Sequence, residues 1–87
     1  MSVRESTLNR LLANIRQLRR ASGLTQEEFA EQAGFSYKYY QAVEAGRKRD
    51  LRISTLDRLA EAYRVDVAEL LAAKLIVPKN IRRKTTG

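Results

Sequence analysis

Four cationic side chains lie close together between residues 47 and 52. They are Arg47, Lys48, Arg49 and Arg52, and a single acid, Asp50, accompanies them. Guanidinium and ammonium groups gathered in this way can neutralise phosphates. The whole chain has 17 basic and 10 acidic residues and a formal net charge of +7. This charge favours a polyanionic partner, either nucleic acid or an acidic surface.

The residues that carry most enzyme chemistries are missing from this sequence. It contains no Cys and no His, so it lacks thiol nucleophiles, soft metal ligands and the usual proton shuttle at neutral pH. Glu27, Glu28 and Glu31 lie close together, but no nucleophile or metal partner is near them in the sequence. We therefore expect no enzyme activity, no metal and no cofactor.

Composition also indicates where the protein acts. The absence of Cys fits a reducing, cytoplasmic setting. Residues 1–12 interleave charged and polar side chains with apolar ones, unlike a signal peptide, and no apolar run is long enough to span a membrane. We expect a soluble, cytoplasmic protein that does not associate with membranes.

The 87 residues suffice for one domain, and their apolar periodicity predicts an all-α bundle of about five helices. The first helix has one apolar stripe, formed by Leu8, Leu11, Leu12, Ile15 and Leu18. Gly23 should end this helix. A capping box of Ser2 with Glu5 is one possible start. A cap by Ser6 or Thr7 would make the helix shorter.

The second helix, of about nine residues, is marked at both ends. Thr25 and Glu28 have the spacing of a capping box, and Leu24 and Phe29 have that of a hydrophobic staple. Gly34 can adopt the left-handed conformation that turns the chain sharply after the helix.

A third helix follows almost at once. Ser36 is its expected N-cap, with Phe35 packed against Tyr40. Val43 should be buried, and Gly46 should close the C-terminal end. Two short helices separated by a tight turn are the geometry of a helix-turn-helix.

Residues 47–53 should form a basic loop before two further helices. Ser54 is the expected cap of the fourth helix, whose buried face consists of Leu56, Leu59, Ala60 and Tyr63. Asp66 and Glu69 have the spacing of another capping box and open a fifth helix that runs to about Leu75.

The end of the chain differs in composition from the rest. Pro78 discourages further helix, so we expect a helix-turn-helix domain over residues 1–75 and a mobile basic tail over residues 76–87. The end of the fifth helix has more apolar residues than a short terminal helix needs. This surplus favours a dimer interface formed by Leu71, Leu75, Ile76 and Val77. Alternatively, Leu70 and Leu71 complete the core of a monomer.

The sequence resembles the phage repressor and Cro-like helix-turn-helix family, the xenobiotic response element type. The matching residues are Ile15-Arg16-x-x-Arg19, Gly23 to Ala30, Gly34-Phe35-Ser36, Glu44-x-Gly46, Leu56-x-x-Leu59-Ala60 and Leu70-Leu71. They fall at fixed spacings across all five predicted helices. Two features depart from the family: Tyr40 replaces a smaller aliphatic residue, and the loop after Gly46 lacks the common proline.

The resemblance implies a five-helix, lambda-repressor-like bundle that binds double-stranded DNA as a homodimer on a roughly palindromic operator. The third helix, about residues 37–45, would enter the major groove, and the second would lie across the DNA backbone. The resemblance also implies that Gln26 contacts the backbone and that Arg19 pairs with Glu44, tying the first helix to the third.

Helical geometry selects the residues that would read bases. With Tyr40 and Val43 facing the core, the opposite side of the third helix would present Tyr37, Lys38, Gln41 and Ala42. Lys38 can donate to guanine, Gln41 suits adenine and Ala42 can touch a thymine methyl group. Tyr37 could pack on a thymine methyl group or reach a phosphate.

Contacts with the DNA backbone are expected on both sides of this helix. Gln26 lies in the first turn of the second helix, where the positive end of the helix dipole attracts a phosphate. The loop residues Arg47, Lys48, Arg49 and Arg52 would neutralise further phosphates, and Arg52 could enter a narrowed minor groove. Tyr39 is either a phosphate contact or a packed surface aromatic.

These patterns predict a transcription regulator, similar in length to restriction-modification controller proteins. Without a separate ligand domain, such a protein would be regulated by its own concentration and by cooperative dimer binding. The alternative is an antitoxin or adaptor whose main partner is a protein, bound through the segment after Leu75.

Overall fold

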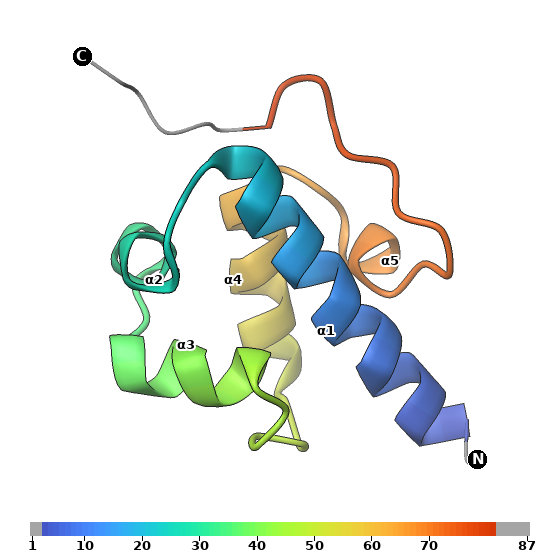
Figure 1. Cartoon of the computed structure of the whole chain (residues 1–87). Coiled ribbons are helices and arrows are strands. Elements are labelled where there is room, and N and C mark those ends of the chain that lie inside the picture. Colours follow the sequence, from blue (N-terminus) through green and yellow to red (C-terminus); the bar gives the residue numbers. More distant parts are fainter. Residues whose placement is uncertain (1–2, 82–87) are drawn as a thin grey trace.

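The computed structural model describes the backbone of residues 3–81 and the side chains of residues 7–81. This part of the chain is all-helical, which confirms the predicted fold class. Its elements are α1 (Val3–Ser22), α2 (Gln26–Ala33), α3 (Tyr37–Glu44), α4 (Ile53–Tyr63) and α5 (Val67–Leu70). In Figure 1, α2 and α3 lie on one side of the bundle and α5 on the other, with α1 and α4 between them.

The boundaries of α1 settle part of the question that the sequence left open. The helix already includes Val3, so Ser6 and Thr7 lie inside it and do not cap a shorter helix. Ser2 lies outside the described residues. At the other end, Gly23 has a φ of 72°, the left-handed conformation expected where the helix ends.

Both ends of α2 form as the sequence predicts. The Thr25 hydroxyl accepts from the backbone N–H of Glu28 at 3.1 Å, and the Glu28 carboxylate accepts from the backbone N–H of Thr25 at 2.9 Å. This is a complete capping box. Gly34, with a φ of 79°, ends α2 and turns the chain toward α3.

The ends of α3 also match the prediction. The Ser36 hydroxyl accepts from the backbone N–H of Tyr39 at 3.1 Å. Beyond the C-terminal end, Gly46 has a φ of 80°, and its N–H donates to the Val43 carbonyl at 3.0 Å. The next N–H, of Arg47, donates to the Ala42 carbonyl at 2.9 Å. These two bonds form a Schellman motif.

The predicted start of α4 is wrong by two residues. Ser54 lies within the first turn, and the N-cap is Arg52, which makes no side-chain capping bond. The Arg52 carbonyl instead accepts the first helical bonds, from the N–H groups of Thr55 and Leu56. Leu51, packed against the core just before the cap, anchors the chain at this earlier entry point.

The predicted end of α5 is also wrong, because the helix stops at Leu70 and not near Leu75. Its start is as expected, with the backbone N–H of Asp66 donating to the Glu69 carboxylate at 2.7 Å. At the other end of α5, two side chains of α1 bind the carbonyl groups of the last residue and of the residues that follow. Asn14 Nδ2 donates to the carbonyls of Leu70, at 2.8 Å, and Ala72, at 2.9 Å, and Arg10 Nε donates to that of Leu71, at 3.1 Å. These contacts hold the chain in a non-helical path.

Three aromatic rings form the centre of the core. Phe29 stacks on Tyr63 with a centroid separation of 4.3 Å and lies 4.8 Å from the ring of Tyr40. The hydroxyl groups of Tyr40 and Tyr63 are 3.3 Å apart. Burial raises the pKa of both phenols well above its ordinary value, so both stay neutral. Tyr40, which departs from the family pattern, is therefore a fully buried core residue with a partner for its hydroxyl.

The segment after α5 differs from the expected mobile tail as far as the structure describes it. Ile81 is 5% exposed and belongs to the hydrophobic core, with Val77 packed against that core. Arg64 donates to the Asn80 carbonyl at 3.4 Å. The segment is held because an isoleucine side chain anchors it. Residues 82–87, the rest of the predicted tail, lie outside the described residues.

Candidate nucleic-acid interface

Three of the four predicted base-reading residues share the exposed face of α3. Tyr37 is 44% exposed, and Lys38 and Gln41 are also exposed. Gln41 Nε2 lies 3.5 Å from the Tyr37 hydroxyl, one helical turn away. This face presents an ammonium group, a carboxamide and a phenol to the solvent, a mixture of donors and acceptors.

Ala42, the fourth predicted base reader, does not lie on this exposed face. It is 9% exposed, so the expectation that its methyl group points outward is wrong. Ala42, Val43 and Glu44 are all buried at the end of α3. The packed side of the helix is therefore wider there than a projection from Tyr40 and Val43 suggests.

The ion pair between Arg19 and Glu44 that the resemblance implies is present. Arg19 Nε donates to Glu44 Oε2 and Arg19 Nη2 donates to Glu44 Oε1, both at 2.9 Å. Gln26 Nε2 also donates to Oε1, at 3.0 Å. The side chain of Glu44 is 3% exposed. The carboxylate therefore joins α1, α2 and the end of α3.

The electrostatics of this cluster keep Glu44 charged. Burial alone would raise the pKa of its carboxyl group, but hydrogen bonds from Arg19, Tyr40 and Gln26 outweigh burial and hold this pKa below its usual value. The hydrogen bond with Glu44 in turn raises the pKa of Arg19. Both members of the pair are ionised at neutral pH.

Gln26, the predicted backbone contact on α2, is the first residue of that helix and is half-buried. Its carboxamide is already bound to Glu44 through one N–H. A primary amide carries a second N–H, which remains to be used.

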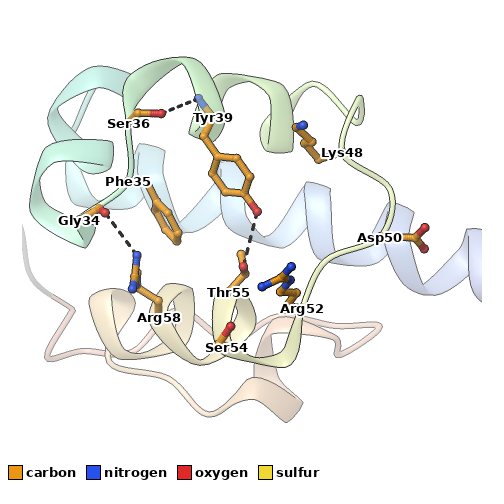
Figure 2. A pocket seen from close by; sticks show the side chains of 10 residues that line it. All are labelled: Gly34, Phe35, Ser36, Tyr39, Lys48, Asp50, Arg52, Ser54, Thr55 and Arg58. Carbon is orange, nitrogen blue, oxygen red and sulfur yellow. Dashed lines mark hydrogen bonds between the residues drawn. The ribbon is translucent and has the colours of Figure 1, made fainter.

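A groove of about 570 Å³ separates α3 from the start of α4 (Figure 2). It is lined by Gly34, Phe35, Ser36, Tyr39, Lys48, Asp50, Arg52, Ser54, Thr55 and Arg58. Figure 2 shows Tyr39 reaching from α3 toward Thr55 of α4, and their hydroxyl groups are 3.5 Å apart. The groove combines three cationic side chains and several hydroxyl groups with one carboxylate, that of Asp50. Its lining is thus positive on balance, which suits an anionic group.

The basic loop contributes to this groove only in part. Lys48 and Arg52 line it, whereas Arg47 and Arg49 are exposed outside it. Tyr39 is half-buried, with its ring 5.7 Å from that of Phe35. It is both a packed aromatic residue and a groove-lining hydroxyl, so the two alternatives for Tyr39 do not exclude each other.

The sequence alone predicts no interface role for the three groove residues of α4. They are Ser54, expected there only as a cap, Thr55 and Arg58. Arg58 lies over the ring of Phe35 at 5.2 Å and donates to the Gly34 carbonyl at 3.3 Å, so it links α4 to the turn between α2 and α3. The available signal was their position in the first two turns after the basic loop.

Most of the residues predicted to form a dimer interface pack within a single chain. Leu71, Leu75 and Val77 are half-buried and pack against the core. Ile76 is 78% exposed. Leu70 is fully buried and Leu71 packs against the core, as expected if these two residues complete the core of a monomer.

The described residues contain no helix that combines the length and the apolar character needed to cross a bilayer. They also contain no group of His, Cys, Asp and Glu side chains arranged to hold a metal ion.

Two short helices joined by a sharp turn, the second with an exposed polar face beside a cationic groove, define a helix-turn-helix protein. A family model described as Helix-turn-helix matches residues 15–70. An uncharacterized HTH-type transcriptional regulator, y4dJ, of Sinorhizobium fredii is 44% identical over 59 residues, which cover 68% of this chain and 75% of that protein. No solved structure matches the chain. The chain belongs to the helix-turn-helix family, of the phage repressor and Cro-like type indicated by its sequence.

Proposed function

We propose that this protein is a transcription regulator that binds double-stranded DNA in a sequence-specific manner through residues 1–75. The observation that carries the proposal is the exposed face of α3, where Tyr37, Lys38 and Gln41 stand next to the cationic groove. In this arrangement α3 lies in the major groove and α2 across the backbone. The regulator y4dJ, similar over most of this chain, supports the same role.

Base reading is assigned to the three exposed residues of α3. Lys38 donates to guanine, and Gln41 pairs with adenine or a neighbouring base. Tyr37 packs on a thymine methyl group or donates to a phosphate. Ala42 is left out because it is buried.

Backbone contacts come from both flanks of α3. Gln26 contacts one strand from the start of α2. Tyr39, Lys48 and Arg52 face the groove, where a phosphate of the other strand fits between α3 and α4. Arg47 and Arg49 add positive charge outside it. If a dimer neutralises about eight phosphates, log K falls against log salt concentration with a slope near −7.

The protein acts as a homodimer on a roughly palindromic operator. Two copies related by a two-fold axis place their α3 helices in successive major grooves, about one helical turn apart. Ile76, exposed beyond α5, is the apolar side chain best placed to join an interface between copies.

Selection of preferred duplexes from a random DNA pool tests this function. We expect enrichment of a two-fold symmetric site. Absence of enrichment at moderate salt would contradict it and favour the reading in which the main partner is a protein.

Two lysines provide a matched comparison on the selected site. Lys38→Ala should relax the base preference at one position of each half-site. The free energy that discriminates between the preferred base and the others should fall there by about 1–3 kcal/mol. Lys48→Ala should weaken all duplexes alike and make the salt slope shallower by about one per subunit. Equal effects of the two variants on sequence preference would contradict the assigned roles.

A further inference from the structure

The carboxylate of Glu44, at the end of α3, holds parts of two other helices at the same time. From these two helices its oxygens accept three hydrogen bonds, two from Arg19 in α1 and one from Gln26 at the start of α2, all between 2.9 and 3.0 Å. Because Glu44 is 3% exposed and Arg19 is 16% exposed, these contacts are largely shielded from water. The Gln26 side chain is therefore attached to a buried, ordered anchor before any ligand arrives.

We propose that Glu44 is a positioning residue for DNA binding, which fixes the carboxamide of Gln26 so that its second N–H donates to a phosphate of the DNA backbone. The inference rests on the proposed function, because it requires Gln26 to contact DNA. It adds a role for Glu44 that is distinct from holding α1 against α3.

A primary amide can bind Glu44 and a phosphate at the same time. Gln26 has two N–H donors on one planar group, so binding one of them to Glu44 also sets the direction of the other. An unattached glutamine side chain would have to be ordered when DNA binds. Removing this requirement strengthens binding roughly two- to tenfold for one long side chain.

Arg19 offsets the negative charge that Glu44 would otherwise place close to the DNA. A carboxylate close to a phosphate would repel it, and the repulsion would be strong in a poorly hydrated site. Arg19 meets both oxygens of Glu44 in a two-bond pair, which offsets the negative charge. The pair thus leaves Gln26 anchored next to a group of little net charge.

Substitutions at two glutamines of α2 provide the first test. The probe is a duplex of random sequence, since a backbone contact acts on every sequence alike. Gln26→Met should weaken binding roughly two- to tenfold or more. The matched control is Gln32→Met, at an exposed position near the other end of the same helix, and it should leave affinity unchanged.

The role of Glu44 is isolated by a double-mutant cycle. Glu44→Gln, measured well below its unfolding temperature, should weaken binding, and adding Gln26→Met to it should weaken binding less than Gln26→Met does alone. If Glu44 has only a structural role, Gln26→Met will reduce affinity by the same factor in both backgrounds. That additive result would overturn the proposal.

A second measurement uses the wild-type protein without DNA and does not depend on a variant folding. In NMR spectra, the side-chain amide group of Gln26 should be ordered, unlike that of Gln32. Its chemical shifts should change in acid as Glu44 becomes protonated. The ionisable groups that donate hydrogen bonds to the Glu44 carboxylate belong to Arg19 and Tyr40, and neither titrates in acid. The proposal would also be overturned if the Gln26 amide group were as mobile as that of Gln32 and its chemical shifts depended on pH no more than those of Gln32.

The outcomes separate this inference from the proposed function. A wild-type protein with no affinity for any duplex would contradict the function itself. A wild-type protein that binds DNA, together with a Gln26→Met variant that binds as well as the Gln32→Met control, would contradict only the inference.

Discussion

Asn14 in α1 donates a hydrogen bond of 2.8 Å to the carbonyl of Leu70, the last residue of α5, and the two residues are 56 positions apart in the sequence. The same amide group donates to the carbonyl of Ala72 at 2.9 Å. Asn14 is 6% exposed, one of few buried polar side chains among the described residues. It thereby supplies to the end of α5 the donors that a longer helix would supply from its own backbone.

Replacing this amide should therefore destabilise the protein. Asn14→Ala leaves two carbonyls without their donors, and an unsatisfied buried polar group costs about 1–3 kcal/mol. The free energy of unfolding, measured in urea, should fall by that amount. Asn9→Ala, at an exposed position of the same helix, is the control and should change stability by less than about 0.5 kcal/mol. Equal effects of the two substitutions would show that the contact contributes nothing.

This contact also explains which helix ends were predictable from the sequence. The box formed by Thr25 and Glu28 depends on residues three positions apart, so local spacing was sufficient. The end of α5 depends on Asn14, whose position relative to Leu70 follows only from the folded bundle. Capping rules use residues close in sequence, so they predict a capping box but not a helix end that depends on a distant residue.

The ion pair of Arg19 and Glu44 makes stability depend on pH in acid. The pKa of Glu44 is lower in the folded protein than its ordinary value of 4.5. The folded state therefore favours the ionised carboxylate. The stabilisation is complete above the unfolded pKa and is lost as the pH falls through the folded pKa.

Comparison with Glu44→Gln measures this effect. Breaking a buried pair costs about 3–5 kcal/mol, and most of that difference should appear above about pH 5. The gap between the unfolding free energies of wild type and variant should narrow as the pH falls from there. A gap that stays constant between neutral pH and strong acid would contradict the assigned pKa direction.

The candidate interface was predictable to a similar, limited degree. Tyr37, Lys38 and Gln41 follow from the period of a single helix, and the structure leaves them exposed. Ala42 was misplaced because a helical projection does not show how wide the packed side of α3 becomes at its end, where Ala42, Val43 and Glu44 are all buried. Thr55 was missed for a related reason, since it meets Tyr39 only when α4 packs beside α3.

Ile81 should contribute to stability although it lies near the end of the described chain. Its side chain is 5% exposed within the core. Ile81→Ala removes buried carbon atoms and should lower the free energy of unfolding by about 2 kcal/mol or more. Ile53→Ala, at a position that is 70% exposed, is the matched control, with an expected change of less than about 0.5 kcal/mol. A mobile tail, as the sequence predicted, would give no difference between the two.

Arg64 is the non-glycine residue with a positive φ in the described chain, at φ 60° and ψ 43°, where α4 ends. The left-handed conformation costs an L-residue with a β-carbon about 1–2 kcal/mol. Glycine avoids this cost but loses more chain entropy on folding, by about 0.5–1 kcal/mol. Arg64→Gly should therefore stabilise the protein by about 0.5–1 kcal/mol and raise its Tm by several degrees.

Two companion variants separate backbone strain from side-chain contacts. Arg64→Ala also removes the exposed bond to the Asn80 carbonyl but keeps the β-carbon, so it should bring no gain. Gly34→Ala is the reverse change at the end of α2, where φ is 79° and an added β-carbon would meet no atom within 4 Å. It should destabilise by about 1 kcal/mol through conformation alone. If Arg64→Gly and Arg64→Ala change the Tm equally, the strain at this position is not what limits stability.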